Sequence, residues 1–294
     1  MEQILFALPP RLREGFSAFT PADWGELEEI RLRTHAPVRL VCSHGERELE
    51  IEVLPGELEL MLELAGRASL HTVLPQLRRG YLTLRGGHRL GVCGTAVMGE
   101  GELRGISPLS SLNLRLARSV KGAGEGVMGA LCPDGHFRST LILAPPGAGK
   151  TTLLRDVVRC LSEGVGCVPH RVGLADERGE VAALYRGEPQ LDVGRRTDVM
   201  EGCPKAAALM LLLRGMNPGV LAADEITAPA DLRAMEQAAG CGVELLCTAH
   251  GREREDLERR KLYREWMESG IFHTLVTIQG ENGLRKYETE ELSC

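Results

Sequence analysis

The amino-acid sequence predicts an α/β protein in which a parallel sheet wrapped by helices follows a smaller α+β domain. The first observation behind this prediction is that, from residue 127 onward, short apolar runs alternate with helical patterns, an order that is typical of parallel sheets. The second is a glycine-rich loop between one of these strands and the helix after it. The third is that residues 1–120 hold short strand-like runs broken by Gly and Pro, without such a loop.

Within residues 1–120 the apolar pattern predicts both helices and strands. In chain order the predicted elements are a strand at Val38 to Cys42 after the lead-in Trp24 to Arg33, a helix at Leu58 to Ala65, a hairpin of Tyr81 to Leu84 and Leu90 to Cys93, and a strand at Leu112 to Leu116. Gly86 and Gly87 supply the positive φ that the hairpin turn requires. The segment Lys121 to Gly126 then combines three glycines with two charges, so we expect a flexible connector.

Residues 127–294 are predicted to form the second domain. Its strands and helices alternate along the chain: strand Ser139 to Ala144, helix Lys150 to Leu161, strand Val172 to Ala175, helix Pro204 to Leu213, strand Val220 to Ala223, helix Ala230 to Ala239 and strand Val243 to Thr248. A closing helix at Glu253 to Glu268 precedes an edge hairpin of Ile271 to Ile278 and Leu284 to Tyr287. The carboxyl ends of such parallel strands meet at one edge of the sheet, where ligands bind.

Size and charge exclude several classes of protein. The 294 residues favour two domains, and the formal net charge of −6 provides no positive field for a nucleic acid, so none is expected as a partner. The longest apolar run, Ala206 to Leu213, is far shorter than the ~20 residues of a membrane-spanning helix. With nine cysteines, no C-x-x-C pair and no secretory signal, we expect a cytoplasmic protein with reduced thiols.

The glycine-rich loop is Ala144 to Thr152, with the sequence APPGAGKTT. A loop of this kind passes close to the β- and γ-phosphates of a nucleotide, which requires small residues, and its lysine places a charge between those phosphates. Ala144 stands where the usual pattern begins with Gly. The residues expected to bind the phosphates of ATP are Pro146, Gly147, Ala148, Gly149, Lys150, Thr151 and Thr152.

Hydrolysis requires carboxylates in addition to the loop, and the segment GVLAADEI supplies them. Its apolar strand delivers Asp224 and Glu225 to the carboxyl edge of the sheet. We expect Asp224, together with the hydroxyl of Thr151, to hold Mg²⁺. Glu225 is the candidate for polarising the attacking water.

Two further strand ends carry polar residues toward the same edge. After Ala175 come Asp176, Glu177 and Glu180, which either support the metal ligands or provide a second candidate base. The choice between Glu177 and Glu180 is open. The last strand ends in a segment with Thr248 and His250, and His250 is a candidate sensor of the γ-phosphate.

Arginines outside the loop are candidates for completing the site of a neighbouring subunit. Arg195 and Arg196, in the stretch GRRTDV, are either arginine fingers or ordinary surface residues.

The order of these motifs resembles the secretion ATPase superfamily of type II and type IV pilus motors. That superfamily carries a phosphate loop, an Asp box, a Walker B strand and a His box in the order found here, as APPGAGKTT, LADERGE, LAADEI and CTAHG. The segments EEIRLRTHAPVRL, RRGYLTLRGGHRLGVCGTA, ISPLSSLNLRLAR and GRRTDVMEGCPKAAALMLLLRGMNPGVLAADEI are similar to the stage III sporulation protein AA family over nearly the whole chain. The resemblance implies a RecA-like P-loop NTPase core.

The same resemblance implies a homo-hexameric ATPase, held at the membrane by embedded channel proteins between mother cell and forespore. Its roles carry over to particular residues: Walker A to Lys150 and Thr151, the Asp box to Asp176, Glu177 and Glu180, Walker B to Asp224 and Glu225, and the His box to His250. It also makes Arg89, Arg104 and Arg115 candidates for reaching a neighbouring nucleotide.

Many type II relatives have a tetracysteine zinc insert and a further helical carboxy-terminal region, and this sequence shows neither. How those enzymes couple to their substrates therefore cannot be carried over to this chain. Two alternatives to a motor therefore stay open. One is a nucleic-acid translocase, which acidic charge and few aromatic residues disfavour. The other is a nucleotide-gated scaffold that binds ATP with little turnover.

Overall fold

The computed structural model describes residues 2–66, 76–78, 80–281 and 284–292. The chain divides into two compact units. The amino-terminal unit consists of Met1–Arg118 with Tyr185–Gln190, and the carboxy-terminal unit consists of Ser119–Leu184 with Leu191–Cys294. Each unit has its own sheet and its own apolar core.

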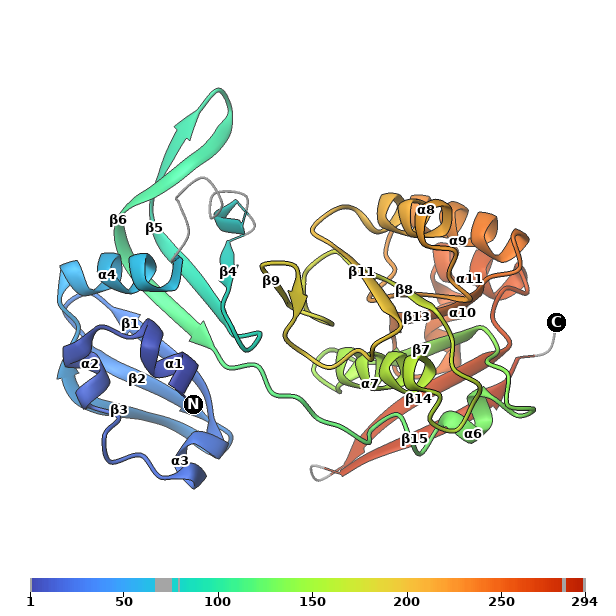
Figure 1. The fold of residues 1–294 in the computed structure, drawn as a ribbon, viewed down its shortest axis with the longest axis horizontal. Helices are drawn as coiled ribbons and strands as arrows, with labels where there is room; N and C mark the ends of the chain where they lie inside the picture. The colour runs from blue at the N-terminus through green and yellow to red at the C-terminus, as the bar shows by residue number, and fades with distance from the viewer. Residues whose placement is uncertain (1, 67–75, 79, 282–283, 293–294) are drawn as a thin grey trace. The chain divides into compact units, whose positions relative to one another are not determined.

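The amino-terminal unit is built on an antiparallel sheet of order β3-β2-β1-β6-β5-β4 (Figure 1). Its strands are β1 (Leu27–Arg33), β2 (Pro37–Cys42), β3 (Gly45–Glu52), β4 (Tyr81–Thr83), β5 (Arg89–Gly99) and β6 (Glu102–Arg115). Its helices are α1 (Glu2–Ala7), α2 (Pro10–Glu14), α3 (Pro21–Glu26) and α4 (Pro55–Gly66). On β1, buried Ile30 and Leu32 share the face that packs on the helices, because side chains of a strand alternate between its two faces. Leu27 joins the same core because the register shifts between Leu27 and Glu29.

The predicted hairpin of Tyr81 to Leu84 and Leu90 to Cys93 is present as β4 with β5, whereas the long hairpin of β5 with β6 was not predicted. Pairing continues outward to Gly99 and Glu102, past the last residues that pair with β1 and β4. We call this outer part of the hairpin the arm. Val97 and Met98 of the arm are exposed, so neither face of the arm buries an apolar stripe. Without that stripe the arm lacks the pattern by which strands are recognised in a sequence.

The carboxy-terminal unit has a sheet of order β11-β8-β12-β13-β7-β14-β15, and within the described residues all neighbouring pairs are parallel except β14 with β15. The strands of this sheet are β7 (Thr140–Ala144), β8 (Val172–Asp176), β11 (Thr197–Glu201), β12 (Val220–Ala223), β13 (Glu244–His250), β14 (Thr274–Glu281) and β15 (Leu284–Glu291). The short pair β9 (Leu184–Tyr185) and β10 (Glu188–Pro189) belongs to neither large sheet, and Tyr185–Gln190 is part of the amino-terminal unit. The predicted strands of this unit are present in the predicted chain order, and the structure adds β11 at the edge of the sheet, which the sequence did not predict.

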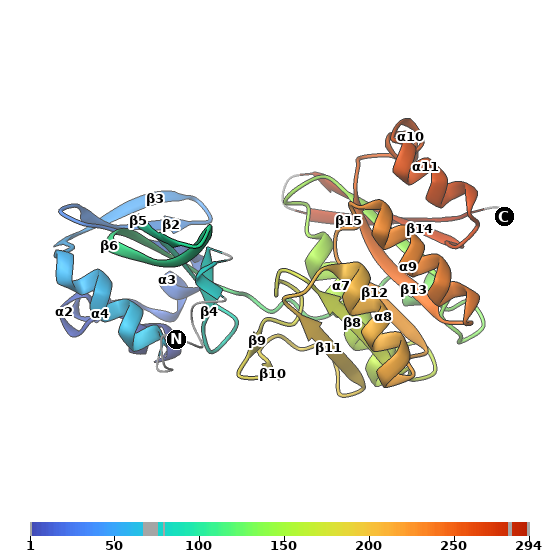
Figure 2. The same cartoon turned by 90° about the horizontal axis from the view of Figure 1, so that it is seen from above.

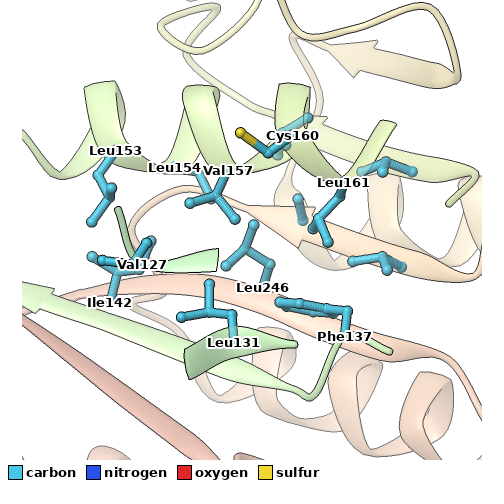
Figure 3. Close-up of a cluster of buried hydrophobic side chains, with 14 of the residues drawn as sticks. Val127, Leu131, Phe137, Ile142, Leu153, Leu154, Val157, Cys160, Leu161 and Leu246 are labelled. Atoms are coloured by element: carbon cyan, nitrogen blue, oxygen red, sulfur yellow. The ribbon is translucent and has the colours of Figure 1, made fainter. Parts of the chain in front are cut away.

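Helices cover both faces of this sheet (Figure 2). They are α6 (Met128–Leu131), α7 (Lys150–Glu163), α8 (Lys205–Met216), α9 (Pro229–Gly240), α10 (Arg254–Arg259) and α11 (Lys261–Glu268). In Figure 3, Leu154 and Val157 of α7 point toward Ile142 and Leu246 of the sheet, and the whole cluster is buried. The opposite face packs against α8, α9, α10 and α11. The predicted closing helix is therefore two helices, separated at Arg260.

The predicted flexible connector is packed instead of loose. The amide of Gly124 donates a 2.7 Å hydrogen bond to the buried Asp156 Oδ2 of α7, and Lys121 pairs with Asp192 at 2.6 Å. A β-carbon at Gly124 would lie 2.8 Å from the backbone nitrogen of Val157. Gly124 therefore permits close approach to α7, and the expectation of a free linker was wrong.

Among the described residues, none of the helices has both the length and the apolar character needed to cross a lipid bilayer.

Candidate functional site

The glycine-rich loop lies between buried β7 and the first turn of α7, as its position in the sequence predicted. Gly147 and Gly149 have φ values of 77° and 100°, which residues with a side chain rarely adopt. Pro146 and Ala148 complete the loop, and Thr152 is the third residue of α7. This arrangement directs backbone N–H groups and the positive end of the helix dipole toward the space above the loop.

Lys150 begins α7 and lies folded over the loop. Its Nζ donates to the carbonyl oxygens of Ala144 at 3.0 Å and Pro145 at 3.1 Å, and it lies 2.8 Å from His250 Nδ1. Burial lowers the pKa of Lys150, while Asp224 and Glu225 act in the opposite direction. Because an ammonium group only donates, His250 Nδ1 is the acceptor, and its Nε2 carries the ring proton.

Asp224 follows β12 and receives two hydroxyl groups. Thr151 Oγ1 donates to Asp224 Oδ2 at 2.8 Å, and Thr248 Oγ1 donates to Asp224 Oδ1 at 2.7 Å. Thr248 belongs to β13 and is fully buried. The structure therefore brings Thr151 and Asp224 together, and it places Thr248 against the other oxygen of the same carboxylate.

Glu225 has a strained backbone and two side-chain partners. Its φ is +49°, a left-handed conformation that costs free energy in a residue with a β-carbon and concentrates at functional sites. The amide of Glu225 donates to Thr248 Oγ1 at 2.7 Å. Its Oε1 is hydrogen-bonded to His250 Nε2, and its Oε2 accepts from Arg178 Nη1 at 2.9 Å. Lys150, His250 and Glu225 thus form one connected chain of contacts.

Asp176 is the last residue of β8, and its carboxylate is hydrogen-bonded to backbone amides. It is 1% exposed, and its carboxylate accepts from the amides of Glu180 at 2.8 Å, Val181 at 3.0 Å and Ala182 at 2.8 Å. Burial raises the pKa of Asp176, and the three amides oppose that rise. Glu177 beside it pairs with Lys205 at 2.7 Å.

Arg155 is a buried residue of α7 that sequence reasoning did not single out. Its guanidinium donates to the carbonyl oxygens of Val181 and Glu180, both at 2.6 Å. The loop after β8 is therefore attached to the same helix that carries Lys150. A charged residue in the apolar stretch TLLRDVV was the available signal, because a buried charge requires a specific partner.

The arginines proposed as fingers have partners elsewhere. Arg195 pairs with Glu163 at 3.1 Å, and Arg196 Nη1 donates to the carbonyl oxygen of Ser162 at 2.8 Å. Both partners lie in the last turn of α7, roughly 20 Å along the helix from Lys150. The structure does not bring Arg195 and Arg196 to the phosphate loop of their own chain.

The three candidate arginines of the amino-terminal unit have partners within that unit. Arg89 lies over the ring of Tyr81 at 4.3 Å, and Arg104 pairs with Glu100 at 2.5 Å. Arg115 lies 3.3 Å from Glu29.

Comparison with known proteins agrees with this geometry. A family model described as "Sporulation stage III, protein AA" matches residues 1–287. The chain belongs to this family. It is 37% identical over 284 residues to stage III sporulation protein AA of Bacillus subtilis, covering 96% of this chain and 92% of that protein. It is also 31% identical over 161 residues to the uncharacterized protein ycf45 of Porphyra purpurea, covering 54% of this chain and 26% of that protein.

Two solved structures share the fold of this family member. The pilus retraction motor PilT with bound ADP superposes with a TM-score of 0.61 at 17% identity, over 91% of this chain and 80% of that chain. The ATPase DotB of Legionella pneumophila superposes with a TM-score of 0.56 at 14% identity, over 93% and 81%. The predicted RecA-like P-loop fold is confirmed, and at these identities the likeness concerns the fold alone.

Two residues at the site of this family member were not singled out from the sequence, although Arg178 lies within the segment LADERGE. Arg178 contacts Glu225, and Lys205 contacts Glu177, although each pair is separated along the chain by more than 25 residues. Pairings of this kind depend on which loops meet at the carboxyl edge of the sheet, which a single sequence does not specify.

Proposed function

We propose that this chain is an ATP-hydrolysing motor of the secretion-ATPase kind, which energises assembly of, or transport through, a channel between mother cell and forespore. The observation that carries the proposal is the connected set formed by Lys150, Thr151, Asp224, Glu225 and His250, in which Thr248 links Glu225 to Asp224. A phosphate loop by itself accounts for binding, whereas a carboxylate pair joined to it accounts for hydrolysis. Membership of a sporulation family supports the biological setting.

The proposed metal ligands are the Thr151 hydroxyl and the Asp224 carboxylate, which are 2.8 Å apart. Hard oxygen donors of this type, with one carboxylate, suit Mg²⁺, which is held mainly by waters and substrate phosphates. Bound with ATP, the ion would neutralise charge on the β- and γ-phosphate oxygens. Thr248 holds the second oxygen of Asp224, so the carboxylate is oriented before any ligand arrives.

Lys150 and His250 provide a route from phosphate binding to the candidate base. When ATP enters, Lys150 exchanges the carbonyl oxygens of Ala144 and Pro145 for phosphate oxygens. That movement frees His250 Nδ1 to accept a hydrogen bond from a water, while His250 Nε2–H stays directed at Glu225. Glu225 then orients and polarises the attacking water. Arg178 holds its other oxygen in the resting chain.

The motor itself is proposed to be a ring, most simply a homo-hexamer, at the cytoplasmic face of the membrane. Its contact with the membrane would run through channel proteins, with arginines such as Arg89, Arg104 or Arg115 reaching the nucleotide of a neighbouring subunit. The fold likeness to PilT and DotB supports this arrangement.

Phosphate release from ATP tests the catalytic part of the proposal. We expect Lys150→Ala to weaken ATP binding, and Glu225→Gln to bind ATP while its turnover falls by roughly 100-fold or more. Wild-type turnover in either variant would contradict the assignment. Native mass measurement with and without a non-hydrolysable ATP analogue tests the ring, and a monomer under both conditions would argue against it.

A nucleotide-gated scaffold is the second candidate, because His250 and Arg178 already occupy both oxygens of Glu225 in the isolated chain. Measuring turnover against protein concentration separates the two. A motor completed by neighbouring subunits gains specific activity as the ring forms, whereas a scaffold stays slow at every concentration. For a nucleic-acid translocase, salt-dependent DNA binding and DNA-stimulated hydrolysis would be required.

A further inference from the structure

Arg285, on the carboxy-terminal hairpin, lies directly against the phosphate loop. A β-carbon built on Gly149 would be 2.7 Å from Arg285 Cζ, 2.9 Å from its Nε and 3.0 Å from its Nη1. The central carbon of the guanidinium is thus the nearest atom, with two nitrogens only slightly farther away. A contact at the edge of the group would bring one nitrogen closer than the carbon, so a flat face of the guanidinium covers Gly149.

The opposite face of that guanidinium is available. Arg285 is exposed, and among the residues that the structure describes, its side chain makes no hydrogen bond or ion pair. By contrast Lys286, its neighbour on β15, pairs with Glu288 at 2.8 Å. A planar cation that is held by packing and has one open face is suited to stack on an aromatic ring.

The sheet order places Arg285 at one particular end of the nucleotide. β7, which leads into the phosphate loop, has β13 on one side and β14 followed by β15 on the other. Asp224, Glu225 and His250 all follow or end strands on the β13 side, so the γ-phosphate points that way. The nucleoside end of the ligand then points toward β14 and β15, where Arg285 pairs across the hairpin with Gly280.

Alternation along β15 puts Arg285 on the same face of the sheet as α7. Tyr287, two residues further on, packs against the apolar cluster beneath α7, whereas Leu292 packs into the cluster on the opposite face. Residues two apart on a strand share a face. Arg285 therefore lies on the same face as Tyr287 and faces the loop, and Lys286 faces away from it.

We propose that Arg285 recognises the base of the bound nucleotide by stacking its guanidinium on the ring, with Gly149 supporting the other side. This inference rests on the proposed function only in that the loop takes a nucleoside triphosphate. It adds a residue for the base to a loop that otherwise contacts phosphates alone. Gly149 then has two reasons to be glycine, its left-handed φ of 100° and the space that the guanidinium occupies.

The test compares ATP with inorganic tripolyphosphate, which offers the phosphates without the base. Both ligands are titrated calorimetrically into the full chain and into its Arg285→Ala and Arg285→Lys variants, with Lys286→Ala as the matched control. We expect Arg285→Ala to weaken ATP binding roughly tenfold and to leave tripolyphosphate binding within about twofold of the unchanged chain. Arg285→Lys keeps the charge without the planar face and should recover only a minor part of the loss.

Other outcomes have distinct meanings. Equal weakening of both ligands by Arg285→Ala, with recovery in Arg285→Lys, would make the side chain a phosphate-binding charge and overturn the stacking inference. Unchanged ATP affinity in Arg285→Ala would overturn it as well, while the proposed function stands. If ATP fails to bind the unchanged chain, both the proposed function and this inference fall.

Discussion

Asp176 and Asp224 occupy equivalent places in the same sheet and yet have opposite environments. Each follows an apolar run on neighbouring parallel strands, and Ala175 and Ala223 just before them are paired in register. Asp176 accepts three backbone amides from the loop that follows it. Asp224 accepts two side-chain hydroxyls, which rotate and exchange partners readily.

The residues after each aspartate explain the difference. After Asp176 the chain turns back through Gly179, at a φ of +61°, and presents its amides to the carboxylate. After Asp224 the chain is drawn toward β13, where Ile226 N donates to the carbonyl oxygen of Thr248 at 3.0 Å, so no following amide reaches Asp224. The first aspartate shapes a loop, and the second remains available for a ligand.

Asp224→Asn should produce the largest effect, because it removes the charge from the proposed metal ligand while keeping its size. We expect turnover to fall by roughly 10³-fold, and the free energy of unfolding to change by less than about 1 kcal/mol. Mg²⁺-dependent phosphate release and urea unfolding measure the two quantities. A large loss of stability with turnover retained would reverse the roles assigned to the two aspartates.

Asp176→Ala should act on stability first. Three backbone amides lose their acceptor in a buried place, which should cost about 3 to 5 kcal/mol in the free energy of unfolding. Urea unfolding measures it, with Glu177→Gln as the control that removes only the charge from the half-buried pairing with Lys205. If Asp176→Ala unfolds like the unchanged chain, the loop does not depend on this carboxylate.

The amino-terminal unit also contains a buried polar side chain that accepts from the backbone, His88. Its Nδ1 accepts a hydrogen bond from Ala117 N at 3.1 Å. Burial lowers the pKa of His88 from 6.5 to about 4. The fold thus favours the neutral ring, so its contribution to stability is complete above pH 6.5 and is lost as the pH falls toward 4. The loss should be roughly 3 kcal/mol.

Unfolding of that unit can be followed separately, because the chain has two tryptophans and Trp24 is the one in the amino-terminal unit. In a Trp266→Phe background, the midpoint reported by Trp24 should fall steadily between pH 6.5 and pH 4. His88→Gln retains an acceptor that does not titrate and should flatten this dependence. An unchanged slope in His88→Gln would assign the acid sensitivity to other groups.

Thr248→Val should have the smallest effect. It removes a hydroxyl that contacts both a backbone amide and the carboxylate of the proposed metal ligand. The hydroxyl of Thr248 accepts from Glu225 N and donates to Asp224 Oδ1, and valine has nearly the same shape. We expect turnover about tenfold lower and a loss of about 1 to 2 kcal/mol in unfolding free energy. Thr248→Ser should restore both, and failure of that rescue would indicate that packing, not the hydroxyl, is what matters.

Most of the proposed site was predictable because its residues lie in short, local patterns. The loop APPGAGKTT requires glycines and a lysine within a few residues, and Asp224 and Glu225 follow an uninterrupted apolar strand. The arm of β5 and β6 was not predictable, since a ribbon exposed on both faces has no apolar alternation. The connector before Val127 was misjudged because glycine serves flexibility and close packing alike, and only the presence of α7 decides between them.

Sequence alone sufficed for most strands of the carboxy-terminal unit in chain order, and for the edge of the sheet that carries the polar residues, because hydrophobic periodicity and turn residues act over short distances. It did not predict β11. Tertiary structure decided which polar groups share a proton or a charge. It assigned Asp176 to backbone amides and Asp224 to hydroxyls, joined His250 to both Lys150 and Glu225, and laid Arg285 over Gly149. Hydrogen bonds and packing depend on positions to within an ångström, and those positions are set by segments far apart in the chain.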